Sequence, residues 1–184
     1  RQMCIRDRYD TAKHIGLPDD PKDSKATENN FWPRVISEIT NADKIFNYGE
    51  VLQGDNERID EYQKVIGATT ASAYGATIRS SINSGNLLAS KMEDLQIDVD
   101  NPTAVTWVES HDNYCSDSSY KTVDDNEVIR AWAIICARKS GTPLFYDRPY
   151  GATADNMWGT MNRIGAAGNP FYKDAAVVAV SYTH

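Results

Sequence analysis

The sequence is poor in cysteine and histidine, which limits the metal and redox chemistry that it can carry. Its three cysteines, Cys4, Cys115 and Cys136, are odd in number and have no CxxC spacing. Neither a disulfide framework nor a zinc site is therefore indicated. Cys136 lies in an apolar stretch with helical spacing, and we expect it to be a small buried hydrophobic residue.

Positive charge and long apolar runs are also scarce. Asp and Glu outnumber Lys and Arg by 26 to 19, which gives a formal net charge of −7 and a pI near 4.9. This balance argues against a nucleic-acid partner, because phosphate neutralisation needs clustered Lys and Arg. No apolar run approaches the ~20 residues that span a bilayer, so a membrane protein is not indicated either. A neutral partner such as a carbohydrate is compatible with the acidic surface.

The apolar pattern predicts alternating helices and strands in a chain of 184 residues, long enough to bury the core of one ordinary domain. The clearest strand is 104–109, which is rich in β-branched and aromatic residues. The clearest helix is 124–140, where Asp124 and Glu127 predict a capping box and Gly141 marks the end. Alternation in units of roughly 30 residues or more favours parallel βαβ construction. Further helices are expected over 30–41, 60–66, 77–84 and 173–180, and further strands over 44–51, 68–73 and 143–146.

Three acidic residues, Asp10, Glu50 and Asp112, are each expected where a strand gives way to a loop. Taken singly, Asp10 could cap a helix, and Glu50 after Gly49 could be an exposed carboxylate in a turn. The pair His111–Asp112 could be a satisfied pair or a metal ligand with its hydrogen-bond partner, although no histidines have helical ligand spacing. Spacings of 40 and 62 residues, however, fit one and two units of an alternating barrel. Such a barrel would bring all three carboxylates to one mouth.

Four segments carry a resemblance to a known enzyme family. They are Arg-Tyr-Asp-Thr-Ala-Lys-His at 8–14, Tyr-Gly-Glu-Val-Leu-Gln at 48–53, Trp-Val-Glu-Ser-His-Asp at 107–112 and Gly-Thr-Pro-Leu-Phe-Tyr-Asp-Arg-Pro at 141–149. The first three resemble conserved motifs of the α-amylase family, the family 13 glycoside hydrolases, and the fourth resembles the segment at the last barrel strand. The second and third motifs are closest to those of bacterial secreted α-amylases.

The resemblance implies retaining endo-hydrolysis of α-1,4-glucosidic bonds in starch, glycogen and related glucans, through a covalent glycosyl-enzyme intermediate. Asp10 would be the nucleophile and Glu50 the general acid and then base. Asp112 would bind sugar hydroxyls and stabilise the oxocarbenium-like transition state. A retaining glycosidase needs its nucleophile and acid about 5–5.5 Å apart, and a third carboxylate supplies a like charge that helps to keep the acid protonated.

The resemblance also assigns substrate-binding residues around the three carboxylates. Arg8 would hold Asp10 in its ionised form, and His111 would hydrogen-bond the sugar at the cleavage site. Lys13 and His14 would line the leaving-group side. The backbone carbonyl of His14 would be a ligand of a structural calcium ion, with most of the other calcium ligands outside this chain. Chloride is not expected, because the third motif has Ser where chloride-dependent members have Asn.

By the same resemblance, the fold is α/β: a truncated C-terminal half of a (β/α)8 TIM barrel, from the end of strand 4 through strand 8. Residues 8–180 would be this partial catalytic domain. Residues 1–7 and 181–184 are expected to be non-native or junction sequence, since Cys-Ile-Arg-Asp stands where the family has an apolar strand ending in Gly-Phe. We expect the full-length parent to be extracellular and monomeric. The isolated chain, as half a barrel, is expected to be poorly stable and inactive.

Three other interpretations stay open. A transglycosylase or debranching enzyme of the same family would share the three carboxylates and differ in its loops. A catalytically silent sugar-binding protein on the same fold is expected to lack one of them, whereas Asp10, Glu50 and Asp112 are all present. A calcium-binding module around the 117–125 loop is a weaker alternative, because its carboxylates lack the order and the glycine of an EF-hand.

Overall fold

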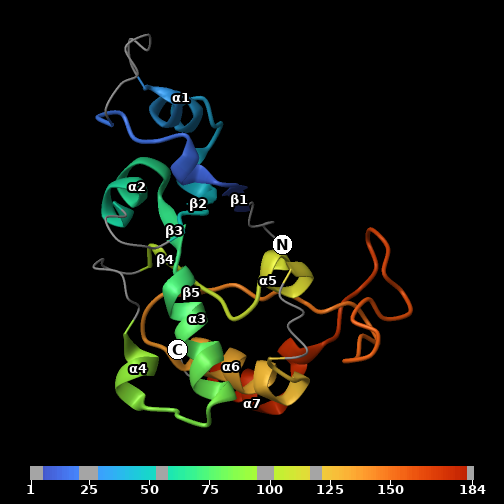
Figure 1. The fold of residues 1–184 in the computed structure, drawn as a ribbon. Coiled ribbons are helices and arrows are strands. Elements are labelled where there is room, and N and C mark those ends of the chain that lie inside the picture. The colour runs from blue at the N-terminus through green and yellow to red at the C-terminus, as the bar shows by residue number, and fades with distance from the viewer. Residues whose placement is uncertain (1–5, 21–28, 53–57, 95–101, 117–121, 182–184) are drawn as a thin grey trace. The chain divides into compact units, whose positions relative to one another are not determined.

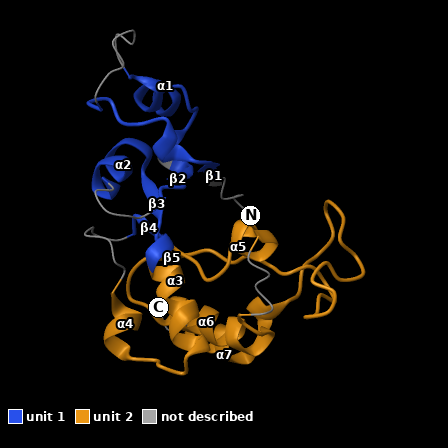
Figure 2. Ribbon diagram, in the orientation of Figure 1, with its two compact units in different colours: residues 1–73, 95–105 blue, residues 74–94, 106–184 orange. Residues whose placement is uncertain are grey.

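The computed structural model describes residues 6–20, 29–52, 58–94, 102–116 and 122–181. The chain divides into two compact units (Figure 2). Unit 1 contains residues 1–73 and 95–105, and unit 2 contains residues 74–94 and 106–184. In the described ranges no helix is both long enough and apolar enough to cross a membrane.

Parallel strands joined by helices make the sheet (Figure 1). β1 (Arg6–Tyr9), β2 (Phe46–Gly49), β3 (Ala68–Thr70) and β4 (Ala104–Thr106) pair side by side in chain order, and each of these pairs is parallel. The two-residue β5 (Thr142–Pro143) completes the order β1-β2-β3-β4-β5. The predicted α/β class is therefore confirmed, and the sheet is compatible with part of a (β/α)8 barrel.

The helices of unit 1 lie in the connections between its strands, and η1, α1 and α2 contribute residues to one apolar cluster. η1 (Ala12–His14), α1 (Phe31–Ser37) and η2 (Ala42–Lys44) fall between β1 and β2, and α2 (Ile59–Ile66) falls between β2 and β3. The buried residues of α2 recur at helical spacing, so one face of this helix meets the core. The cluster consists of Ala12, Leu17, Trp32, Val51, Ile59, Tyr62 and Ile66, with Tyr9 and Val65 packed against it.

The regular secondary structure described in unit 2 is mostly helical. α6 (Asp125–Ala137) packs against α7 (Ala175–Ser181), and the Trp132 ring lies 4.4 Å from the Phe145 ring, measured between centroids. The predicted capping box is present, because the Asp124 side chain accepts from Glu127 N–H while the Glu127 side chain accepts from Asp124 N–H. Cys136 is buried, as expected. The helices are α3 (Ser72–Asn83), α4 (Ala89–Glu93), α5 (His111–Ser116), α6 (Asp125–Ala137), η4 (Phe171–Lys173) and α7 (Ala175–Ser181).

Several boundaries differ from the predicted ones. The helix expected over 30–41 ends at Ser37, whose hydroxyl donates to the Arg34 carbonyl at 2.9 Å. The strand expected over 104–109 ends at Thr106, because beyond it the Val108 carbonyl accepts from the Arg79 side chain at 2.5 Å. The strand expected over 143–146 is reduced to β5, and the helix expected over 77–84 already begins with α3. α4 and α5 were not predicted.

The expected terminal segments are only partly described. Residues 1–5 and 182–184 lie outside the described residues, as do residues 117–121 of the polar loop considered for calcium. Arg6 and Asp7 form the first half of β1, paired with Phe46 and Asn47. The strand that ends at Tyr9 therefore begins earlier than the first motif.

Candidate active site

Two of the three predicted carboxylates follow the ends of adjacent parallel strands. β1 ends at Tyr9 and β2 at Gly49, and these two residues are partners in the register. The pairing continues past the strands, because Glu50 N–H donates to the Tyr9 carbonyl at 2.8 Å and Ala12 N–H donates to the Glu50 carbonyl at 3.0 Å. The carboxyl ends of parallel strands share one edge of a sheet, so Asp10 and Glu50 leave the sheet at the same edge.

Arg8 joins these two carboxylates. Its Nη1 lies 2.8 Å from Asp10 Oδ1, and its Nη2 lies 3.1 Å from Glu50 Oε2. The Asp10 side chain is 66% exposed, whereas the Glu50 side chain is 14% exposed. A shared guanidinium offsets the repulsion between two neighbouring negative charges. The structure thus brings Asp10 and Glu50 together, with one acid open to solvent and the other largely covered.

Thr11, directly after Asp10, has a strained backbone. Its φ of 44° and ψ of 38° lie in the left-handed region, which β-branched residues rarely adopt. In this conformation the Thr11 N–H donates to Glu50 Oε2 at 3.0 Å. Strain of this kind persists where the surroundings fix the backbone, and it is common at functional sites.

Gly49 permits a close approach behind the site. A Cβ at this position would lie 2.9 Å from Ile66 Cδ1 and 3.0 Å from Ala12 Cβ. A larger residue would therefore require the Ile66 side chain to move and η1 to shift by a few tenths of an ångström. Close packing against Ile66 and Ala12 explains why the second motif has a glycine at position 49. The absence of a side chain there keeps Glu50 close to η1.

Lys13 and His14 lie on η1, beside Asp10 in the chain. Ala12 anchors this short helix in the core, and the Tyr62 hydroxyl donates to the Lys13 carbonyl at 3.1 Å. The Lys13 side chain is half-buried and that of His14 is exposed. Among the described residues, no group of three or more His, Cys, Asp or Glu side chains could hold a metal ion. Calcium takes six to eight oxygen ligands, so the His14 carbonyl alone does not make a calcium site.

His111 and Asp112 form the first turn of α5, in unit 2. His111 Nε2 lies 3.4 Å from Asp112 Oδ1, and their side chains are 54% and 63% exposed. They do not follow a strand directly, since β4 ends at Thr106. Ser110 and Asn113 cap the helix reciprocally: Ser110 N–H donates to Asn113 Oδ1 at 3.1 Å, and Asn113 N–H donates to the Ser110 hydroxyl at 3.4 Å.

Sequence reasoning missed one buried charge pair in the motifs. Glu109 and Arg148 have fully buried side chains, and Arg148 Nη2 lies 2.6 Å from Glu109 Oε1. Glu109 belongs to the third motif and Arg148 to the fourth. An acidic residue at the end of an apolar run is a signal for a buried partner, since a buried charge needs one. The identity of that partner is not contained in the local pattern.

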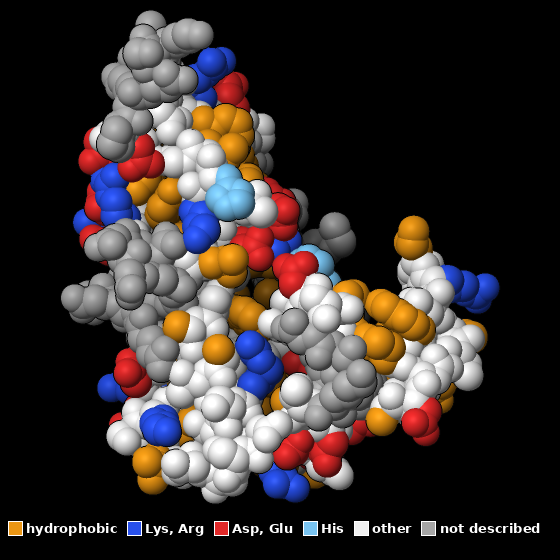
Figure 3. Space-filling view, in the orientation of Figure 1, with side chains coloured by type: hydrophobic (Ala, Val, Ile, Leu, Met, Phe, Trp, Pro, Cys, Tyr) orange, Lys and Arg blue, Asp and Glu red, His pale blue; other side chains and the backbone are white. Residues whose placement is uncertain are grey.

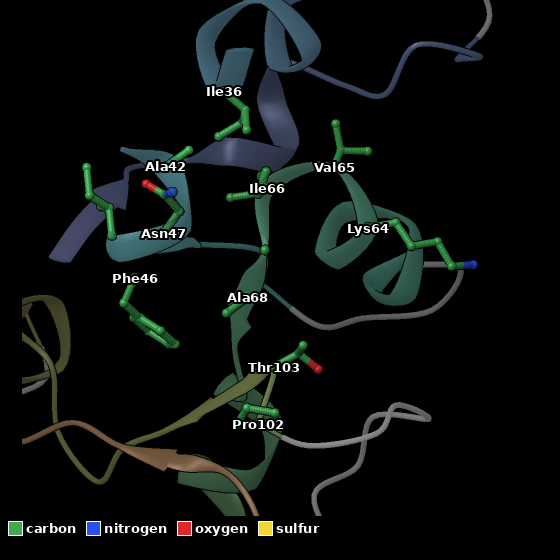
Figure 4. Close-up of a pocket in the computed structure, with 12 residues that line it drawn as sticks. Ile36, Ala42, Phe46, Asn47, Lys64, Val65, Ile66, Ala68, Pro102 and Thr103 are labelled. Carbon is green, nitrogen blue, oxygen red and sulfur yellow. The ribbon is translucent and has the colours of Figure 1, made fainter. Parts of the chain in front are cut away.

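Unit 1 has a pocket of about 320 Å³, whose lining residues are drawn in Figure 4. Neither Asp10 nor Glu50 lines it. Phe46 and Ala68 begin β2 and β3, and Thr103 directly precedes β4. The pocket is therefore at the amino ends of the strands, whereas Asp10 and Glu50 follow the carboxyl ends. Active sites of parallel α/β folds form at the carboxyl ends, so this pocket is not the candidate site.

The surface drawn in Figure 3 is mixed in character. Acidic, basic and histidine side chains reach this face, with apolar side chains among them. Large exposed hydrophobic residues of the described chain include Phe31, Leu52, Tyr150 and Trp158.

Comparison with known proteins relates the chain to one class of enzyme. It is 46% identical over 198 residues to an α-amylase of Butyrivibrio fibrisolvens, covering 95% of this chain and 20% of that protein. It is 35% identical over 179 residues to an α-amylase of Clostridium acetobutylicum, covering 96% of this chain and 21% of that protein. The chain is similar to one part of each of these α-amylases. No protein-family model matches it.

The α-amylase resemblance seen in the four motifs is thereby confirmed. The similarity extends over nearly the whole chain, well beyond the motif residues. The chain spans about a fifth of the length of these curated relatives.

Proposed function

We propose that the chain is part of the catalytic domain of a retaining endo-α-1,4-glucan hydrolase, corresponding to the C-terminal half of a (β/α)8 barrel. The observation that carries this proposal is the convergence of Asp10 and Glu50 on Arg8, from the ends of adjacent parallel strands. Two carboxyl groups close enough for one to attack and the other to protonate are what a retaining glycosidase requires. The whole protein's substrate would be starch, glycogen or a related glucan.

Asp10 and Glu50 are suited to different roles because their surroundings differ. Asp10 is exposed and paired with Arg8 Nη1, as expected of a nucleophile that attacks the anomeric carbon as an anion. Glu50 Oε2 accepts from Arg8 and from Thr11 N–H. An acid proton would therefore lie on Oε1, the oxygen from which it would be given to the glycosidic oxygen. After the sugar–oxygen bond breaks, the same carboxylate would take a proton from the attacking water.

The remaining assignments extend the same proposal. Asp112 would hold sugar hydroxyls and stabilise positive charge on the ring, and His111 would hydrogen-bond the same sugar. Lys13 and His14 would line the leaving-group side, next to the nucleophile in the chain. We further propose a secreted, monomeric parent protein with a structural calcium ion. The His14 carbonyl would supply one ligand of this ion, and no step of the reaction is assigned to the metal.

The test uses the full-length gene product that contains this chain. We expect it to hydrolyse starch with retention of the anomeric configuration, which NMR of the first-formed product measures. Glu50→Gln should lower kcat on starch by roughly 10²- to 10⁴-fold, because it removes general acid catalysis. For a substrate with an activated aryl leaving group, kcat/KM should fall much less, because kcat/KM reports formation of the glycosyl-enzyme and this leaving group departs without a proton. The kcat on that substrate should still fall, because the attacking water needs Glu50 as its base.

Glu61→Gln is the matched control, because Glu61 is an acid on α2 of unit 1 that pairs with Arg58, the residue before this helix. This variant should keep wild-type turnover. Unchanged starch cleavage in Glu50→Gln would overturn the assignment of the acid. Pullulan and cyclodextrin, assayed in parallel, separate an α-amylase from a debranching enzyme or a transglycosylase.

A further inference from the structure

Arg148 is the centre of a buried hydrogen-bond network in unit 2. Its Nε donates to Glu109 Oε2 at 2.9 Å and its Nη2 to Glu109 Oε1 at 2.6 Å, a bidentate pair in which neither side chain is exposed. Its Nη1 donates to Asp125 Oδ1 at 2.8 Å, and Nη2 also donates to the Val123 carbonyl at 2.8 Å. Hydrogen bonds from all three of its nitrogens thus fix the planar guanidinium. No other side chain has such a fork of donors.

The same guanidinium contacts both flanks of the segment that contains His111 and Asp112. Glu109 precedes Asp112 by three residues, and Tyr114 follows it by two. Arg148 Cζ lies 5.8 Å from the centroid of the Tyr114 ring, within the range of a cation–π contact. Tyr114 is fully buried. Residues 110–113 are therefore held at each end by a contact with Arg148.

The segment between these two contacts has little freedom left. Ser110 and Asn113 cap each other at the start of α5, and the Tyr114 N–H donates to the Ser110 carbonyl at 3.0 Å. His111 and Asp112 are left exposed on this turn. Their placement thus depends on buried neighbours, of which Glu109 and Tyr114 both contact Arg148.

Stability alone does not account for such a pair. Burying two charges requires removing both from water, and apolar side chains of similar volume are often at least as stabilising. We propose that Glu109 and Arg148 are positioning residues that fix His111 and Asp112 for the reaction, an inference that rests on the proposed function. Neither residue touches the sugar; they act through the backbone of residues 110–113.

The decisive variant is the double substitution Glu109→Leu with Arg148→Met in the full-length gene product. It removes the two fully buried charges together. Asp125 also loses Arg148 as a partner, but its side chain is 40% exposed and water can take that place, so the protein is expected to fold. Amide hydrogen exchange over residues 110–116 should become faster by about tenfold or more, because the turn loses its fixed flanks. kcat on starch should fall by roughly 10- to 100-fold, since small displacements of a catalytic group have effects of this size.

Arg138→Met is the matched control. Arg138 is another partly buried arginine of unit 2, and it donates to the Tyr74 hydroxyl at 3.1 Å and to the Glu93 carbonyl at 2.5 Å. It should change neither kcat nor exchange over residues 110–116. A purely structural role of the buried pair would lower Tm without this selective effect.

Arg148→Lys decides the matter if the double variant does not fold. Lysine keeps the charge beside Glu109 but cannot reproduce the fork of hydrogen bonds, so exchange and kcat should both change in the same direction, to a smaller extent. Wild-type exchange over residues 110–116, or wild-type kcat, in the folded variants would overturn the positioning role. Absence of starch cleavage in the wild-type protein would instead overturn the proposed function, while the exchange comparison still tests the placement of the turn.

Discussion

Arg8 and Glu50 are ion-paired between two neighbouring strands, with 3.1 Å between Nη2 and Oε2. The other arm of the same guanidinium holds Asp10 at 2.8 Å. A residue within β1 therefore binds the acid that follows β1 and the acid that follows β2. This arrangement makes Arg8 the shared cation of the candidate site.

Replacing Arg8 should reduce catalysis much more than it reduces stability. Arg8→Met leaves Asp10 and Glu50 close together without their cation, and we expect kcat on starch to fall by about 10²-fold or more. Arg8→Lys should recover part of this loss, because lysine supplies the charge but not the two-armed geometry. Steady-state kinetics of the full-length gene product measures both. Arg34→Met, at an exposed position of α1, is the control, and equal losses in both variants would contradict this role.

Thr11→Asn should stabilise the protein. Asparagine tolerates the left-handed region better than a β-branched residue does, so the substitution relieves strain at φ 44°. We expect the free energy of unfolding to rise by about 0.5–1 kcal/mol. This is a fraction of the energy that a non-glycine residue usually loses in the left-handed region. Denaturant unfolding measures it. Activity should be retained, because the backbone N–H that donates to Glu50 is unchanged; a lower stability would show that the threonine side chain is needed.

Tyr9 should contribute to the loss of stability at alkaline pH. Burial, and then the neighbouring charge of Asp7, raise the pKa of Tyr9 above its ordinary value of 10.0. The folded state therefore favours the neutral phenol. This stabilisation is fully present below pH ~10 and is lost as the pH rises through the higher folded pKa.

Tyr9→Phe should flatten the alkaline part of the stability curve, measured as the free energy of unfolding between about pH 9 and pH 12. The Tyr9 hydroxyl also donates to Asn47 Oδ1 at 3.2 Å, so a small decrease near neutral pH is expected as well. Tyr150→Phe, at an exposed position, is the control. A pH profile identical to the wild type would contradict the contribution of Tyr9.

Local sequence patterns were sufficient to predict the elements that have a clear apolar period or a clear capping motif. The buried positions of α2 and α6 recur at helical spacing, and Asp124 with Glu127 is a complete helix start, so both helices lie close to their predicted positions. The junction at Glu50 was also predictable, because this carboxylate follows a short strand that contains Phe46 and Tyr48. The junction at Asp10 was predicted from the resemblance of the first motif, since β1 has the polar sequence Arg-Asp-Arg-Tyr. The same patterns do not fix where a strand stops pairing, since β4 ends at Thr106 although the next residues are buried and apolar.

The contacts that complete the site could not be predicted, because they join residues distant in the sequence. Glu109 and Arg148 are 39 residues apart, and nothing in either motif specifies their pairing. α5 is only six residues long, and its start depends on the side chains of Ser110 and Asn113 rather than on apolar periodicity. The strain at Thr11 is likewise set by the neighbouring strand end and not by the preference of threonine.

Asp124→Ala tests whether the capping box matters for the stability of unit 2. The substitution removes the acceptor of the Glu127 N–H, at 2.9 Å, at the start of α6. We expect the free energy of unfolding to fall by about 1 kcal/mol, the usual effect of losing an N-terminal cap. Asn126→Ala, an exposed position in the first turn of the same helix, should leave stability within about 0.5 kcal/mol of the wild type. Hydrogen exchange should quicken first at the N-terminal turn of α6 in Asp124→Ala; equal effects of the two substitutions would show that helix propensity, and not the cap, determines the change.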